Sequence, residues 1–501
     1  MVAKAHARSE AAAYVLMLTL VLAALLSPQA GHGEVVLSQV SPKLSLSGSL
    51  RLRWEYWKWF TPTGPQNNEY DFLASVFRGM VKWTDESFDL IIEGQNTSFI
   101  DLPADVVAPL PQGVLGGLGA IYRTYNRRQN DTGIFLRQGV LTLKRLGLAG
   151  LTLKGGRFEF SEGNEVLTQE PTLDWLKNVR LSQRLIGPFN FAHVGRSFDG
   201  AVGSFSRGPL SFTLMAAHPT QGGFDLAAMQ EMDEIDVLYA AINLTRPALL
   251  PNGDARIFYI YYGDDRRVLK VDNRPVAVRA SDRRQDISLH TEGAHWISLL
   301  PTSLGPVDLL AWGAVQQGQW GFLEHFAWCW DVEAGWQPRT LPWKPWVRIG
   351  YGRSSGDDDP NDNDHNTFFQ ILPTARLYSF TTFYNLMNNE DAFVQLILRP
   401  TAGVVWRTDF HNIRLTEARD LWYQGPGATL STRDIGFGFA GRPAFGERNL
   451  FRVLETSLTY AWSPHLECTV YYAHVFGDAV VRKIFAGDQA DFGYVELLLK
   501  F

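Results

Sequence analysis

The sequence predicts an all-β fold, a transmembrane antiparallel β-barrel of about 18 strands with short periplasmic turns and long extracellular loops. Three observations favour this fold. Apolar and polar residues alternate with a period of two in segments of about ten residues. The connections between these segments are alternately short and long. The chain closes with a strand-like segment that ends in Phe501.

An N-terminal secretion signal precedes the strands. Two basic residues come before an uncharged run at residues 14–26, and small residues follow it. This order is typical of a signal peptide, and a run of 13 residues is shorter than the roughly 20 that a membrane-spanning helix needs. We expect cleavage after Gly33, with Ala30 as the alternative. Residues 1–33 are then the signal, and 34–501 form a single barrel domain.

Eighteen segments carry the period of two. They lie at residues 44–59, 70–84, 87–98, 133–145, 150–160, 194–206, 209–217, 234–246, 254–263, 284–299, 305–318, 324–337, 342–354, 391–400, 402–414, 449–462, 465–476 and 490–501. A closed barrel pairs all its backbone N–H and C=O groups internally, so it can span a bilayer without an apolar helix. No Ser/Gly linker or charge block divides the mature sequence.

The connections fall into two sets that alternate along the chain. The short set is rich in Gly or Pro and lies at residues 84–86, 207–209, 247–253, 301–306, 338–342, 400–401 and 463–464. The long polar set lies at residues 99–132, 161–193, 218–233, 264–283, 355–390 and 415–448. Short periplasmic turns and long extracellular loops are typical of bacterial outer-membrane barrels. The sequence therefore predicts a location in the bacterial outer membrane.

The last segment, DFGYVELLLKF at residues 491–501, has two distinct faces. One carries Gly493, Val495, Leu497, Leu499 and Phe501, and the other carries Tyr494, Glu496, Leu498 and Lys500. Outer-membrane barrels commonly present such a strand, ending in Phe, to their assembly machinery. That machinery and the lipid bilayer are expected partners. An ordinary edge strand at the end of a domain is the alternative.

Charged residues in the strands are predicted to face the lumen, because a lipid-facing Arg at mid-membrane costs about 2–4 kcal/mol. This rule assigns inward positions to Arg51, Arg53, Arg78, Asp89, Glu93, Arg157, Arg196, Arg348 and Arg407, with Gly155 on the same face as Arg157 and Asp199 near Arg196. Of the 46 basic residues, 35 are Arg, whose planar fork suits carboxylates. Rings of Arg favour anions in a pore. Any single Arg is more simply explained as an ion-pair partner that braces the wall.

Composition and motifs exclude several other classes of function. A net charge of −6 argues against a nucleic-acid partner. Cys329 and Cys468 lie far apart and have no metal-binding or CxxC spacing. The sequence contains no HExxH, GxSxG or P-loop motif. We therefore predict that the protein is not an enzyme, and keep an enzyme or adhesin built on the same barrel as an alternative.

Two long connections carry further signals. Residues 99–132 combine Pro, Gly, aromatic and basic residues, and either fold inward to gate the pore or form a solvated surface loop. The stretch GDDDPNDNDHN at 356–366 offers hard oxygen ligands that suit calcium, namely Asp357, Asp358, Asp359, Asp362 and Asp364. The EF-hand frame is missing, so a solvated acidic loop is the simpler interpretation. No cofactor other than such a structural calcium ion is expected.

Five stretches are distinctive: RLRWEYWKWF at 51–60, LIIEGQNTSF at 90–99, LTLKGGRFEF at 151–160, NVRLSQRLIGPFNFAHVGRSFDGAVGSF at 178–205 and GDDDPNDNDHNTFFQILPTARLYSF at 356–380. They resemble the alginate-export family of outer-membrane porins, in its broader and less characterised branch. The resemblance runs from about residue 44 to residue 501. It implies an 18-stranded barrel with an electropositive constriction that passes an anionic polyuronate outward.

The resemblance also implies which residues line the pore. Family-type pore residues map onto Arg51 or Arg53, Arg78, Arg137, Arg157, Arg196, Arg348 and Arg407, with Asp89, Glu93 and Asp199 as acidic counterparts. The pattern departs at residues 463–465, a short turn where the alginate exporter has a long periplasmic one.

The function expected from these observations is passive diffusion of an anionic, alginate-like polysaccharide or oligosaccharide through an Arg-rich lumen. The alternatives are an uptake porin for another sugar or organic acid and an outer-membrane enzyme or adhesin. Periplasmic secretion partners are a further expectation.

Overall fold

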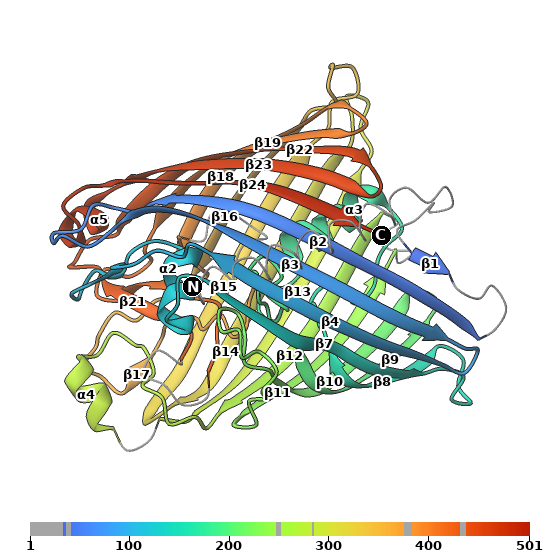
Figure 1. Ribbon diagram of the computed structural model, residues 1–501, viewed down its shortest axis with the longest axis horizontal. Helices are drawn as coiled ribbons and strands as arrows, with labels where there is room; N and C mark the ends of the chain where they lie inside the picture. Colours follow the sequence, from blue (N-terminus) through green and yellow to red (C-terminus); the bar gives the residue numbers. More distant parts are fainter. Residues whose placement is uncertain (1–33, 37–41, 247–251, 283–284, 375–382, 431–436) are drawn as a thin grey trace, which may run out of the picture.

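Eighteen antiparallel strands form one barrel (Figure 1). The computed structural model describes residues 34–36, 42–246, 252–282, 285–374, 383–430 and 437–501. The barrel strands are β2 (Lys43–Lys58), β3 (Glu69–Thr84), β4 (Phe88–Ile100), β7 (Asp131–Leu143), β8 (Leu151–Phe158), β9 (Phe198–Arg207), β10 (Leu210–Pro219), β11 (Ile235–Thr245), β12 (Gly253–Asp264), β13 (Ile287–Leu300), β14 (Val307–Trp320), β15 (Leu323–Trp336), β16 (Trp346–Ser354), β18 (Glu390–Thr401), β19 (Val404–Arg414), β22 (Asn449–Ser463), β23 (Leu466–Gly477) and β24 (Gln489–Lys500). The predicted signal peptide lies outside the described residues.

The barrel closes between its first and last long strands. β24 pairs antiparallel with β2, and two backbone hydrogen bonds of 2.7 and 3.0 Å join Phe501 to Gly48 at the end of this seam. The short strands β1 (Glu34–Val36) and β17 (Asp364–His365) pair with β2 and β15. The predicted all-β fold, a closed antiparallel barrel of 18 strands, is confirmed. Each of the eighteen predicted segments overlaps one barrel strand.

Successive strands are antiparallel, so their connections alternate between the two ends of the barrel. One end carries the short connections, and we call it the short-turn end. The other carries the long connections and is the long-loop end. The described helices belong to long connections: α2 (Leu118–Asn126), α3 (Pro171–Leu176), the π-helix η1 (Lys177–Leu181), α4 (Val276–Ser281) and α5 (Ala479–Ile484). None of these helices is long and apolar enough to cross a membrane.

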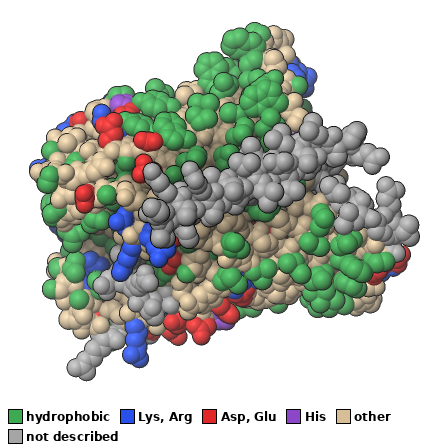
Figure 2. Space-filling view, in the orientation of Figure 1, with side chains coloured by type: hydrophobic (Ala, Val, Ile, Leu, Met, Phe, Trp, Pro, Cys, Tyr) green, Lys and Arg blue, Asp and Glu red, His purple; other side chains and the backbone are tan. Residues whose placement is uncertain are grey.

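The outer face of the wall is apolar and the inner face is polar. On β15, Trp330 and Val332 are exposed on the outside, whereas Asp331 and Glu333, which alternate with them in sequence, are buried inside. Figure 2 shows hydrophobic side chains gathered over the outer surface of the strands. Exposed apolar residues at every second strand position suit a surface covered by lipid.

An aromatic cluster fills the interior near the long-loop end. It comprises Trp57, Trp59, Phe60, Phe383, Trp422 and Phe485, all buried, and we call it the aromatic plug. The rings of Trp59 and Phe383 stack at 4.7 Å, and Trp422 lies 6.1 Å from Trp59. Phe383, Trp422 and Phe485 come from three different connections. The plug therefore joins the long loops to one another inside the barrel.

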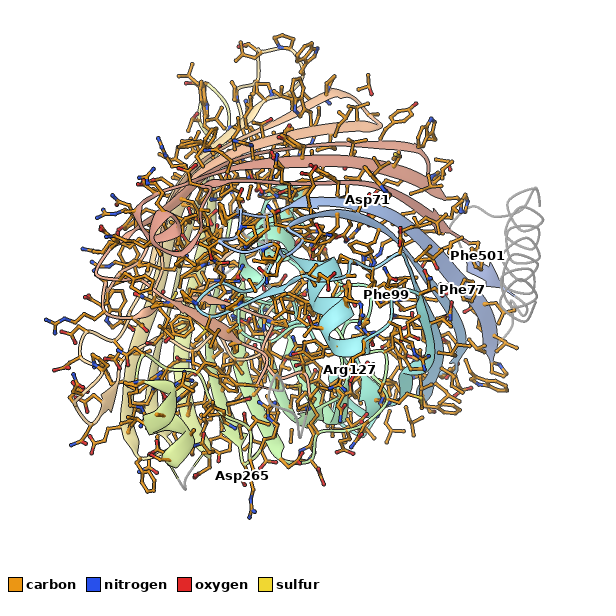
Figure 3. The ribbon with its side chains drawn as sticks, turned by 60° about the vertical axis from the view of Figure 1, so that its left-hand side comes forward. Asp71, Phe77, Phe99, Arg127, Asp265 and Phe501 are labelled. Carbon is orange, nitrogen blue, oxygen red and sulfur yellow. The ribbon has the colours of Figure 1, made fainter. Side chains whose placement is uncertain are left out.

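The connection that holds α2 also folds into the barrel, so the helix part of residues 99–132 is not a solvated surface loop. Tyr122 is fully buried, and its hydroxyl oxygen accepts a hydrogen bond from the backbone N–H of His193 (2.8 Å). Figure 3 shows α2 surrounded by the strands. Gly117 precedes the helix, and a Cβ atom at this position would lie 2.0 Å from the Trp57 ring. Only glycine allows this close approach.

Candidate pore-constriction site

The connection between β8 and β9, residues 159–197, runs through the barrel interior, and we call it the lumen loop. Its helix α3 reaches the short-turn end, where the Thr172 hydroxyl accepts a hydrogen bond from Gln337 (3.3 Å). Trp175 packs against Trp346 with 4.4 Å between the ring centroids. The lumen loop therefore occupies the side of the lumen next to β14–β16.

Buried ion pairs anchor the first half of the lumen loop to β12 and β15. They join Lys177 to Asp254 (2.9 Å), Arg180 to Glu333 (2.7 Å) and Arg184 to Asp331. The side chains of Arg180 and Glu333 are 2% and 0% exposed. Arg348, a predicted pore arginine, is a second cation on Glu333 (2.6 Å). Arg348 therefore braces the wall and the loop on this side.

The opposite wall holds the second half of the lumen loop through its backbone carbonyl groups. These hydrogen bonds run from Arg51 to Asn190 and Ala192 (2.9 Å each), from Arg53 to Phe191 (3.1 Å), and from Gln95 to His193 and Val194 (3.0 and 3.1 Å). Buried carbonyl groups need such partners because leaving them unpaired is costly. The wall arginines therefore fix the path of the loop.

Four wall arginines gather around Asn190: Arg51, Arg53, Arg78 and Arg137, which we call the arginine cluster. The Asn190 side-chain oxygen accepts hydrogen bonds from Arg78 (2.9 Å) and Arg137 (2.7 Å). Arg137 is the extra residue of a β-bulge in β7, because Glu93 pairs with Gln138 and the next residue of β4 pairs with Leu136. Bulges commonly redirect a side chain in this way.

Three carboxylates face the arginine cluster. Arg53 pairs with Glu496 (2.6 Å) and Glu55 (3.3 Å), and Arg137 pairs with Glu159 (2.7 Å). Burial alone would raise the pKa of Glu159, but the charges of Arg137 and Arg78 lower it to about 2. Burial lowers the pKa of the neighbouring His193 to about 4, which leaves this ring neutral at pH 7. Four positive and three negative side chains give the cluster a net charge of +1.

Part of the arginine cluster is accessible from the short-turn side. The side chains of Arg51 and Arg78 are 17% and 21% exposed, whereas that of Arg137 is 1% exposed. The inward positions that follow toward the short-turn end are polar and half-buried, namely Ser47, Ser49, Lys82, Thr459 and Thr469. Solvent therefore reaches the inner wall between the short-turn end and the cluster.

Four other predicted pore residues lie outside the arginine cluster. Asp89 pairs with Lys144 (2.8 Å) and Glu93 accepts a hydrogen bond from Gln138 (2.6 Å), both on the inner face of β4. Arg196 is buried and donates to the carbonyl group of Ala428 (3.3 Å), and Arg407 donates to Asp409 (2.7 Å). Each of these side chains has a structural partner in the wall or loops.

The inward prediction for Arg157 and Asp199 is wrong. The register places Arg157 on the same face of β8 as Leu153, which is 46% exposed on the outside. Asp199 lies opposite Arg157, and the two form a bidentate ion pair at 2.7 and 2.5 Å. The fully buried Phe158 fixes this alternation by pointing inward. Arg157 and Asp199 neutralise each other at the end of a short strand. The free-energy cost of an outward-facing arginine is therefore lower here than the prediction assumed.

The five aspartates of the acidic stretch are held in turns and do not gather into one cluster. Carboxylates of this stretch accept hydrogen bonds from nearby backbone N–H groups, as in Asp359 N to Asp357 (3.1 Å) and Asp364 N to Asp362 (2.9 Å). Such bonds stabilise turns. Within the described ranges, none of Asp357, Asp358, Asp359, Asp362 and Asp364 belongs to a group of three ligating side chains within reach of one ion.

Asp357 instead meets Asp420 where two long loops join. The backbone N of Asp357 donates to the Asp420 carboxyl group (3.0 Å), and the Thr367 hydroxyl donates to the same oxygen (2.6 Å). Burial and the charge of Asp420 raise the pKa of Asp357 to about 7. Burial raises the pKa of Asp420 to about 6. Both groups therefore retain protons well above the usual range of Asp.

We expect the contact between these two loops to weaken as the pH rises. In an unfolded chain the pKa of Asp is about 3.9. The stabilisation that protonated Asp357 and Asp420 give to the loop contact is therefore fully present below about pH 4. It is lost as the pH rises through their folded-state pKa values of about 7 and about 6. Protease cleavage within 355–374, corrected for protease activity, should be about tenfold slower near pH 5 than near pH 8. Asp357→Asn should remove most of this difference, and the exposed neighbour variant Asp358→Asn should keep it. Equal cleavage of the wild type at both pH values would contradict the prediction.

The sequence did not predict which residues of the lumen loop belong to the site. Asn190 is the centre of the arginine cluster, and Arg180 and Arg184 anchor the lumen loop. All three belong to the stretch 178–205, which is the most specific part of the family resemblance. That stretch was a usable signal, but its path through the lumen follows from contacts with residues more than 100 positions away.

The closed barrel and its partly blocked, polar lumen define the class of this protein as an outer-membrane β-barrel channel. The alginate export family matches residues 136–486, and the chain belongs to that family. No curated protein matches the chain. In channels of this kind the long loops are extracellular and the short turns periplasmic.

Several solved outer-membrane channels share the fold. OccK9 (OpdG) of Pseudomonas aeruginosa has a TM-score of 0.54 at 10% identity, covering 91% of this chain and 98% of that chain. OccAB1 of Acinetobacter baumannii has a TM-score of 0.53 at 10% identity, covering 91% and 96%. OpdK of Pseudomonas aeruginosa with vanillate has a TM-score of 0.51 at 9% identity, covering 91% and 98%. At these identities the likeness concerns the fold alone.

Proposed function

We propose that the protein lets an anionic, alginate-like polysaccharide or oligosaccharide cross the outer membrane by passive diffusion past the arginine cluster. The observation that carries this proposal is the partial exposure of Arg51 and Arg78 on the short-turn side of the lumen loop. Guanidinium groups bind carboxylates through two parallel hydrogen bonds. A site with a net charge of +1 concentrates anions and repels cations.

A second candidate is a channel for small organic acids. The lumen loop and the aromatic plug fill much of the interior, so a polymer needs both to move, whereas a small carboxylate needs a smaller displacement. OpdK, which shares the fold, was solved with vanillate. Both candidates use the same cationic site and differ in the size of the permeant.

Conductance of the refolded protein in planar bilayers tests the proposal. Under a salt gradient we expect an anion-selective current that oligouronates block. Block that strengthens with oligomer length would favour the saccharide, and equal block by monomeric carboxylates would favour the small acid. A cation-selective current, or no current, would contradict the proposal.

A further inference from the structure

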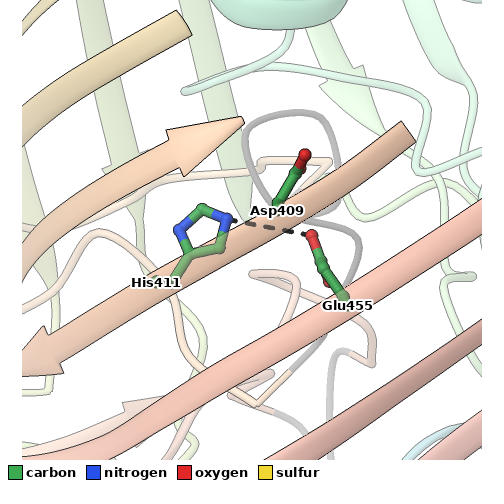
Figure 4. Close-up of side chains that lie close together, drawn as sticks. All are labelled: Asp409, His411 and Glu455. Atoms are coloured by element: carbon green, nitrogen blue, oxygen red, sulfur yellow. Dashed lines mark ion pairs between the residues drawn. The ribbon is translucent and has the colours of Figure 1, made fainter. Parts of the chain in front are cut away.

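Three potential metal ligands meet on the inner face of the wall between β19 and β22. Asp409 and His411 are two residues apart on β19, and Glu455 lies directly opposite Asp409 in the register. One ligating atom from each side chain lies within 4.8 Å of the other two (Figure 4). Within the ranges that the structure describes, this is the one such group of three.

The three ligating side chains are buried, and two of their polar atoms, one on His411 and one on Asp409, lack a hydrogen-bond partner. The three side chains are at most 1% exposed. His411 Nε2 and Asp409 Oδ1 are buried without a hydrogen-bond partner. His411 Nε2 lies 3.8 Å from Glu455 Oε1, which is too far for a hydrogen bond. Buried polar atoms left unpaired are rare and costly, which suggests that a ligand satisfies them.

Neighbouring side chains hold each ligand by its other polar atom. Asp391 accepts a hydrogen bond from His411 Nδ1 (3.0 Å), which leaves the lone pair on Nε2 and matches the carboxylate–histidine–metal arrangement. The Tyr471 hydroxyl donates to Glu455 Oε2 (2.8 Å), and Arg407 donates to Asp409 Oδ2 (2.7 Å). The orientations of the three ligands are therefore fixed by their surroundings.

We propose that Asp409, His411 and Glu455 bind a divalent transition-metal ion, with zinc as the best match. One imidazole nitrogen and two carboxylate oxygens are ligands that zinc favours, whereas calcium and magnesium prefer oxygen alone. Three carboxylates, those of Asp391, Asp409 and Glu455, meet at this site, and Arg407 donates to one of them, so the local charge suits a divalent cation. Gln395 lies opposite Asp409 and has a buried side-chain oxygen without a partner, which suits a fourth ligand.

The site would connect three neighbouring strands of the wall. Gln395 belongs to β18, Asp409 and His411 to β19, and Glu455 to β22. The Phe393 ring stacks on His411 at 5.5 Å, and Tyr384 from the preceding loop donates to Asp391 (2.8 Å). These contacts close the site from the lumen, so the ion would have a structural role and lie away from the path of a permeant.

Metal content of the full-length refolded protein tests the proposal. Protein refolded with zinc and then passed over a weak chelating resin should retain about one zinc ion per chain. His411→Gln and Asp409→Asn should each bind zinc at least about tenfold more weakly, and Asp391→Asn should lose about 10- to 100-fold in affinity. His295→Gln is the matched control, because His295 is a buried lumen histidine that pairs with the single carboxylate of Asp254 (2.9 Å).

A spectroscopic measurement on the wild type does not depend on any variant folding. Cobalt added to metal-free protein should give the visible absorption of a four-coordinate site and reach its end point near one equivalent. Zinc should then displace it. A wild type that binds neither metal would overturn the proposal. Zinc retained by a folded His411→Gln variant, or lost equally by His295→Gln, would overturn it as well.

Discussion

Replacing Glu333 by Gln is expected to lower the free energy of unfolding by about 3–5 kcal/mol and to release the first half of the lumen loop. The Glu333 carboxylate is fully buried and accepts hydrogen bonds from Arg180 (2.9 Å to both oxygens) and Arg348 (2.6 Å). A neutral glutamine amide at position 333 would leave the buried guanidinium groups of Arg180 and Arg348 with too little negative charge beside them. Urea unfolding in lipid vesicles, followed by tryptophan fluorescence, measures the loss.

Two further variants separate this effect from a general loss of charge in the lumen. Glu467→Gln changes a half-buried carboxylate on β23 and should leave the unfolding midpoint unchanged. The double variant Arg180→Met/Glu333→Leu replaces the pair by apolar side chains and should recover part of the stability. A loss below about 1 kcal/mol in Glu333→Gln, typical of exposed pairs, would show that this ion pair does not anchor the loop.

The double variant Arg51→Gln/Arg78→Gln is expected to abolish or reverse the anion preference of the channel. It lowers the net charge of the arginine cluster from +1 (four Arg, three carboxylates) to −1 (two Arg, three carboxylates). A charge about 4 Å from a permeating ion in water contributes roughly 1 kcal/mol, or about fivefold in permeability. The reversal potential under a salt gradient measures this change.

The outer-face ion pair provides a matched control for selectivity. Arg157→Gln/Asp199→Asn removes an arginine of the same barrel while keeping its net charge, and these side chains lie outside the lumen. Its reversal potential should equal that of the wild type. The effect of Arg51→Gln/Arg78→Gln should also shrink in about 1 M salt, where the Debye length falls to roughly 3 Å. An unchanged reversal potential in that variant would exclude the arginine cluster as the selectivity site.

The strands were predictable because each one must satisfy a simple local rule. In a membrane barrel every second residue faces lipid, so the period of two persists in each strand. In β2, Leu52 and Trp54 lie on the outer face, and Arg53 and Glu55 lie on the inner face. The alternation of short and long connections then predicted which connections lie together at each end of the barrel. The sequence also placed the inward arginines of β2 and β3 correctly.

The interior was not predictable to the same extent, because its partners are not marked in the sequence. Arg51 and Arg53 donate to backbone carbonyl groups about 140 positions away, and a carbonyl group has no residue type to recognise. Arg137 faces inward through a bulge that shifts the alternation by one residue. Arg157 was predicted on the wrong face of β8. The rule that charged residues avoid lipid does not consider that an arginine can be neutralised by a neighbouring carboxylate, here that of Asp199.

The position of Arg53 links two late events in the assembly of the barrel. Its guanidinium group contacts Glu496 of the last strand and the carbonyl group of Phe191 in the lumen loop. The first of these contacts joins residues 443 positions apart across the seam, so it forms only when the chain ends meet. Contacts of such sequence separation form slowly. Closure of the cylinder and docking of the lumen loop should therefore occur as one cooperative, late folding step, with Arg53 completing both.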